Sequence, residues 1–153
     1  MGERKGIHSI APMLSPEREA LFPRLADDSY RITSEETCDY NCFAWAANDT
    51  DRWWDPGHYW PEDVPKTLTL DSFARLFGSL GYRRCESEQL EAGFEKAAIY
   101  VDQQGIPSHA ARQLGDGTWT SKLGDWEDIM HTTTAGLEVD SYDAVAVILR
   151  WPR

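Results

Sequence analysis

The sequence has 153 residues, 41% hydrophobic and 27% charged, which predicts one globular domain, 1–153, with a core of its own. The formal net charge of -11 excludes the clustered basic surface that nucleic-acid binding needs, so we expect no nucleic-acid partner. Three cysteines are too few for a disulfide scaffold, and no apolar run reaches the roughly 18 residues of a membrane helix. We therefore expect a cytoplasmic protein that does not associate with membranes, and the sequence does not indicate its oligomeric state.

The N-terminal part of the chain carries few structural signals. Residues 1–17 are expected to form a loose leader, because Pro12 and Pro16 interrupt regular structure. Residues 16–22 favour one or two helical turns, and the polar residues 23–37 predict irregular structure.

A helix is predicted from Asp39 to about Asn48, where a polar start runs into apolar, helix-forming residues. Asp39 is the expected N-cap. Cys42 then falls in the first turn, where the positive end of the helix dipole lowers the pKa of a thiol and favours the nucleophilic thiolate. The alternative is that Cys42 is a small buried apolar residue, as free cysteines often are.

Residues 52–65 form a predicted loop, because they contain three prolines and a glycine. The loop carries aromatic side chains close to carboxylates, a combination that suits a sugar or a cationic ligand. The candidate substrate-binding residues here are Trp53, Trp54, His58 and Trp60. In the alternative interpretation, the rings only pack the loop onto the core.

The second half of the chain predicts one more helix and then a sheet. The helix covers 70–80, with Leu70, Phe73, Phe77 and Leu80 on one face, Thr67 or Thr69 as its cap and Gly81 at its end. An edge strand at 82–85, strands at 96–102, 108–114, 118–123 and 143–150, and a short helix at 125–129 follow. Helices followed by an antiparallel meander predict the α+β class.

The hairpin between the second and third of these long strands has a predictable register. With 115–117 as its loop, Ala111 lies opposite Ser121, so side chains of His109, Gln113, Trp119 and Ser121 share one face. Because this face is polar and aromatic, we interpret it as the floor of a cleft, which adds Gln113 and Trp119 to the candidate substrate-binding residues.

A cysteine at a helix start beside a histidine on a strand is the arrangement that a cysteine hydrolase needs. The imidazole takes the thiol proton, and helix amides stabilise the oxyanion. The sequence order therefore makes Cys42 the candidate nucleophile and His109 the candidate base. A structural role for His109 is the alternative.

This order resembles the NlpC/P60 and CHAP branches of the papain-like cysteine peptidases. The resemblance implies a papain-like fold, with N-terminal helices packed on a small antiparallel sheet. It assigns the nucleophile to Cys42, the base to His109 and the position of the orienting residue to Ser121, with Asp140 or Asp143 as alternatives. Phe43 stands where these peptidases commonly have a serine.

A closer resemblance is to an uncharacterised family of bacterial proteins that is catalogued as a domain of unknown function. It implies no activity. The segments that carry it are 40–46 (YNCFAWA), 59–61 (YWP), 109–114 (HAARQL) and 116–124 (DGTWTSKLG).

The remaining cysteines and histidines suggest a metal site as a minor alternative. Cys38 and Cys42 have the i, i+4 spacing, and His58, His109 or His131 would complete a zinc site. Cys85 is interpreted as a packing residue and His131 as a surface group in a threonine-rich loop. We expect no metal and no cofactor.

Two functional hypotheses follow from the sequence. The first is a cysteine-dependent amidase, peptidase or acyltransferase that acts on a peptide or another amide-containing substrate through Cys42 and His109. The second is a catalytically inactive module that binds a peptide or a protein partner in an aromatic cleft.

Overall fold

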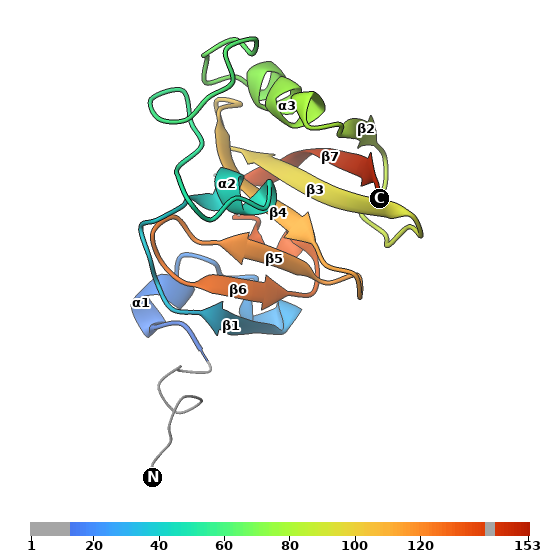
Figure 1. The fold of residues 1–153 in the computed structure, drawn as a ribbon. Helices are drawn as coiled ribbons and strands as arrows, with labels where there is room; N and C mark the ends of the chain where they lie inside the picture. The colour runs from blue at the N-terminus through green and yellow to red at the C-terminus, as the bar shows by residue number, and fades with distance from the viewer. Residues whose placement is uncertain (1–12, 140–142) are drawn as a thin grey trace.

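The computed structural model describes residues 13–139 and 143–153, and its centre is one seven-stranded sheet (Figure 1). The strands are β1 (Tyr30–Ser34), β2 (Arg83–Cys85), β3 (Phe94–Val101), β4 (Pro107–Gln113), β5 (Trp119–Lys122), β6 (Asp128–His131) and β7 (Ala144–Pro152). Their order in space is β1-β6-β5-β4-β3-β7-β2, and every pair of neighbours is antiparallel.

Short helices accompany the sheet, so the fold is α+β and mostly β. They are α1 (Pro16–Glu19), η2 (Ala26–Asp28), α2 (Cys42–Ala46), α3 (Leu70–Ser79) and η3 (Thr134–Leu137). Within the described residues, no helix combines the length and the apolar character that crossing a bilayer requires.

Several predicted elements are confirmed. Helix α3 is capped by Thr69, whose hydroxyl accepts a hydrogen bond from the Ser72 amide, and Gly81 follows it with φ of 105°. Strand β7 lies inside the sheet between β3 and β2. The β4–β5 hairpin has the predicted register, with Gln113 opposite Trp119.

Three local predictions are wrong. Residues 125–129 form a turn and the start of β6 instead of a helix, because pairing with β5 fixes their conformation. Residues 30–34 form the edge strand β1 within the stretch predicted to be irregular. In the predicted leader, Leu14 is buried in the core, while residues 1–12 lie outside the described residues.

The sheet buries a hydrophobic cluster on each face. The first cluster contains α2, the apolar face of α3, and Ile99 and Ala110 of the sheet. The second contains Tyr100 and Ala111. Because side chains alternate along a strand, consecutive residues of β3 and β4 belong to different clusters.

Bulges alter this alternation beside Tyr100. Its partner on β4 is His109, but the next residue of β3 pairs with Pro107, so Ser108 is the extra residue. On β7, Tyr100 pairs with Val145 while Ile99 pairs with Val147. Bulges redirect side chains locally, and these two lie side by side at one end of the sheet.

The side chain of Asn41 joins α2 to the aromatic loop. Its Oδ1 accepts hydrogen bonds from the amides of Ala44, at 3.1 Å, and Trp54, at 3.0 Å, while its Nδ2 donates to the Trp54 carbonyl at 3.0 Å. Asn41, and not the predicted Asp39, is therefore the N-cap. The helix ends at Ala46, earlier than predicted, and Asn48 has a positive φ of 67°.

We expect Asn41→Ala to destabilise the protein by about 2–4 kcal/mol, because it removes the cap and leaves two backbone groups of Trp54 buried without partners. Asn41→Ser retains a capping hydroxyl, so its loss should be smaller. Urea unfolding measures both changes. A loss below about 1 kcal/mol for Asn41→Ala would contradict this account of the cap.

Candidate functional site

Cys42 is the first residue of α2 and lies in the first cluster with only 7% of its surface exposed. Burial raises the pKa of its thiol to about 11, and the hydrogen bond from the Ala110 amide offsets only part of this effect. The thiol is therefore protonated at neutral pH. A helix of five residues does not overcome the loss of solvation.

His109 projects from the opposite face of the sheet. Its ring packs edge-on against Tyr100 of the second cluster, with ring centroids 5.1 Å apart. The neighbouring residue Ala110 contacts Cys42 on the other face. Burial, helped by the nearby His131, lowers the pKa of His109 to about 3, so its ring is neutral at physiological pH.

The structure thus does not bring Cys42 and His109 together. The prediction that they meet between helix and sheet is wrong because α2 covers the face carrying Ala110, whereas His109, one residue earlier in β4, points to the other face. A thiol protonated at neutral pH on one face and an imidazole on the other do not form a nucleophile–base pair.

Ser121 does contact an imidazole, but it is that of His131. The Ser121 hydroxyl lies 2.8 Å from His131 Nε2, and His131 Nδ1 lies 2.8 Å from the Thr133 carbonyl. Because that carbonyl only accepts, Nδ1 donates to it and Nε2 accepts from Ser121. Both residues have no exposed surface, so His131 is not the predicted surface group and the pair has no access to a substrate.

Most of the predicted substrate-binding aromatics are core residues. Trp54 and Trp60 are 5% and 6% exposed and pack in the first cluster. Trp119 lies in the second cluster. These three rings do not form an open wall. For Trp54 and Trp60, the alternative interpretation, in which the rings pack the loop onto the core, is the correct one.

The other predicted site residues are dispersed. Gln113 is buried and donates to the Glu88 carbonyl. Trp53 and the exposed His58 lie together, with ring centroids 5.9 Å apart, and His58 pairs with Asp55. Cys38 is exposed. Across residues 13–139 and 143–153, no three histidine, cysteine or acidic side chains are grouped as metal ligands.

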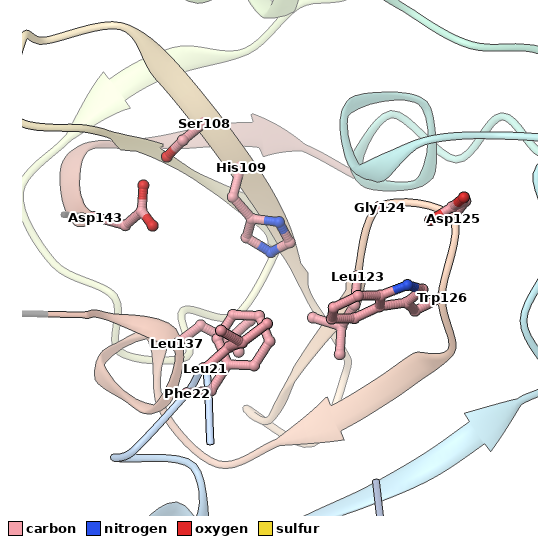
Figure 2. Close-up of a pocket in the computed structure, with 10 residues that line it drawn as sticks. All are labelled: Leu21, Phe22, Ser108, His109, Leu123, Gly124, Asp125, Trp126, Leu137 and Asp143. Atoms are coloured by element: carbon pink, nitrogen blue, oxygen red, sulfur yellow. The ribbon is translucent and has the colours of Figure 1, made fainter. Parts of the chain in front are cut away.

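His109 lines a pocket of about 350 Å³ at the bulged end of the sheet (Figure 2). The ring points from β4 into a space between two apolar walls. Phe22 and Leu137 form one wall, and Leu123 and Trp126 form the other. The remaining lining residues are Leu21, Ser108, Gly124, Asp125 and Asp143.

The Nε2 atom of His109 is buried and has no hydrogen-bond partner among the described residues. Leaving such a polar atom unpaired costs about 1–3 kcal/mol in a folded protein. A neutral imidazole offers one donor and one acceptor. The ring can therefore pair with a hydroxyl, an amide or an amine brought into the pocket.

Arg18 holds the Trp126 wall in place. Its guanidinium lies 4.4 Å from the centroid of the Trp126 ring and pairs with Glu127 at 2.7 Å and Glu36 at 3.1 Å. This contact joins α1 to the turn between β5 and β6. Gly124, with φ of 62°, begins that turn in the left-handed region.

Sequence reasoning missed the residues that complete this pocket. Phe22, Trp126 and Leu137 come from three separate loops or short helices, and no local spacing connects them. The only sequence pattern that points toward this pocket is the alternation that places His109 on one face of the hairpin with Gln113 and Trp119. From the sequence, Asp143 is an alternative orienting residue and not a pocket residue, and Asp140 lies outside the described residues.

Residues 31–150 match a family described as "Domain of unknown function (DUF7689)", and the chain belongs to it. This confirms the resemblance to an uncharacterised family. Comparisons with curated proteins and with solved structures gave no match. Membership in this family assigns no activity.

We expect iodoacetamide to label Cys42 at least about tenfold more slowly than the exposed Cys38 at pH 7.5, because the Cys42 thiol is buried and its pKa is about 11. His109→Ala should leave the rate at Cys42 unchanged. Peptide mass spectrometry measures each rate. Fast labelling of Cys42 that slows in His109→Ala would restore the hydrolase hypothesis.

His109 also predicts a pH dependence of stability. The unfolded ring binds a proton near its ordinary pKa of 6.5, whereas the folded ring stays neutral to about pH 3. Protonation therefore favours the unfolded chain, and the stabilisation that is complete above pH 6.5 declines as the pH falls toward 3.

Relative to His109→Gln, the wild type should lose on the order of 1 kcal/mol of unfolding free energy per pH unit below about pH 6. Urea unfolding between pH 7.5 and 4.5 measures this difference. His58→Gln, which replaces an exposed ring, is the matched control. A difference between wild type and His109→Gln that is constant with pH would contradict the burial of a neutral ring.

Proposed function

We propose that this domain is a binding module, without hydrolase activity of its own, that holds an apolar ligand or an apolar side chain of a peptide or protein partner in the His109 pocket. The pocket volume of about 350 Å³ falls within the range of roughly 300–1,000 Å³ of small-molecule sites. Its walls are aliphatic and aromatic, and three of its polar residues, Ser108, His109 and Asp143, lie on one side, whereas Asp125 lies near Trp126 (Figure 2).

The observation that carries this proposal is the unpaired, buried Nε2 of His109 at a pocket with apolar walls. A bound group that hydrogen-bonds this atom would remove the penalty of leaving it unpaired. The walls would supply affinity through burial of apolar surface, at about 25 cal/mol per Å². The lining thus combines a source of affinity with one group that orients the ligand.

The proposal does not extend to a papain-like arrangement. That arrangement requires a cysteine and a histidine that face each other across a helix and a sheet. Here α2 and His109 lie on opposite faces.

A neutral aromatic alcohol is a direct probe of the pocket. We expect 2-phenylethanol to bind with about millimolar affinity, as its nine heavy atoms allow. In two-dimensional NMR spectra, the amide shifts should concentrate on Ser108, His109, Leu123 and Leu137. His109→Phe retains an aromatic ring but cannot hydrogen-bond, so it should weaken binding about tenfold.

The matched control is His58→Phe, which makes the same substitution at an exposed ring outside the pocket. It should leave the affinity for 2-phenylethanol unchanged. Shifts that are absent from the pocket residues, or that are the same in wild type and His109→Phe, would contradict the proposed site.

A further inference from the structure

The lining of the His109 pocket contains carboxylates but no basic side chain. Asp125 and Asp143 are its charged residues, and none of the ten lining residues is a lysine or an arginine. Within the described residues, neither carboxylate makes a hydrogen bond or an ion pair. The net charge of the whole chain, -11, adds to the negative electrostatic potential of these carboxylates.

Asp143 is the better placed of the two carboxylates. In Figure 2 its side chain lies beside Ser108 and on the same side of the pocket as His109, whereas Asp125 lies beyond Trp126. The backbone of Asp143 is held by two hydrogen bonds with Val139, at 2.9 and 3.0 Å. This backbone pairing places the half-buried Asp143 at the end of an apolar cavity.

A cation with an apolar body matches this arrangement. The body would pack between Phe22, Leu137 and Trp126, while the ammonium would donate hydrogen bonds to the Asp143 carboxylate and the Ser108 hydroxyl. An anionic ligand would place its charge beside the unpaired Asp143 carboxylate. The two basic groups at the Trp126 wall are already engaged: the Lys122 ammonium donates to the carbonyls of Gly124 and Trp126, and Arg18 pairs with Glu127 and Glu36. Charge-assisted hydrogen bonds are roughly twice as strong as neutral ones.

We infer that the preferred ligand of this pocket is an organic primary ammonium ion with an apolar body, held by Asp143 and Ser108. This inference rests on the proposed function, because it specifies which ligands the same site selects. The ammonium group occurs in free amines and at the N-terminus of a peptide that begins with an apolar residue.

Three probes of similar size, each with a phenyl ring, test the charge preference. They are 2-phenylethylamine, 2-phenylethanol and phenylacetate, which are cationic, neutral and anionic at pH 7. We expect the amine to bind at least about tenfold more tightly than the alcohol and phenylacetate to bind more weakly than both. NMR titration of the full chain, at low and high salt, gives the dissociation constants.

Variants assign the preference to one carboxylate. Asp143→Asn should abolish the advantage of the amine over the alcohol, and the dispersion of its amide spectrum shows whether the variant is folded. Asp63→Asn is the matched control, because it changes the net charge equally at an exposed position outside the pocket. It should retain the amine advantage. Ser108→Ala, a second test, should reduce it.

The outcomes separate this inference from the proposed function. Equal affinities for amine and alcohol, or an amine advantage that survives in Asp143→Asn, would overturn the inference and leave the binding site standing. If none of the three probes shifts the pocket resonances, the proposed function fails as well. Phenylalaninamide distinguishes the sources: tighter binding than 2-phenylethylamine indicates a peptide N-terminus, and weaker binding indicates a free amine.

Discussion

The pairing of β3 with β4 is the constraint on which the functional geometry depends. Ile99 lies opposite Ala110 and Tyr100 opposite His109, so two adjacent residues of β4 serve opposite faces of one sheet. A shift of one residue would exchange the faces and bring His109 under α2. The apolar clusters on both faces oppose such a shift, because each contains residues of both strands.

The register also determines the protonation states of the Cys42 and His109 side chains. On one face, burial between α2 and the sheet keeps Cys42 protonated at neutral pH. On the other, burial against Tyr100 keeps the His109 ring neutral while the pocket leaves its Nε2 unpaired. Ser108 at the bulge and Gly124 at the turn both line the pocket at this end of the sheet. Gln113 Oε1 and Asp128 Oδ1 are also buried without a partner, but of the three only His109 Nε2 belongs to a residue that lines this pocket, where a ligand can reach it.

Local patterns were sufficient for the elements with strong periodicity. The loop at 115–117 and the alternation around it fixed the β4–β5 register, and the spacing of Phe73 and Phe77 identified α3. They were insufficient where partners lie far apart in the chain. The edge strand β1 looks polar because Arg31 and Thr33 face solvent, and which sheet face α2 covers depends on packing that no short segment encodes.

The central claim is that His109 presents a neutral imidazole to a pocket on the face opposite Cys42. NMR of the imidazole nitrogens in protein labelled with ¹⁵N-histidine, recorded from pH 8 to pH 4, tests it most directly. We predict that the His109 nitrogens keep the shifts of a neutral ring throughout, in line with a pKa of about 3. Titration of His109 with a midpoint near its ordinary value of 6.5 would contradict the account.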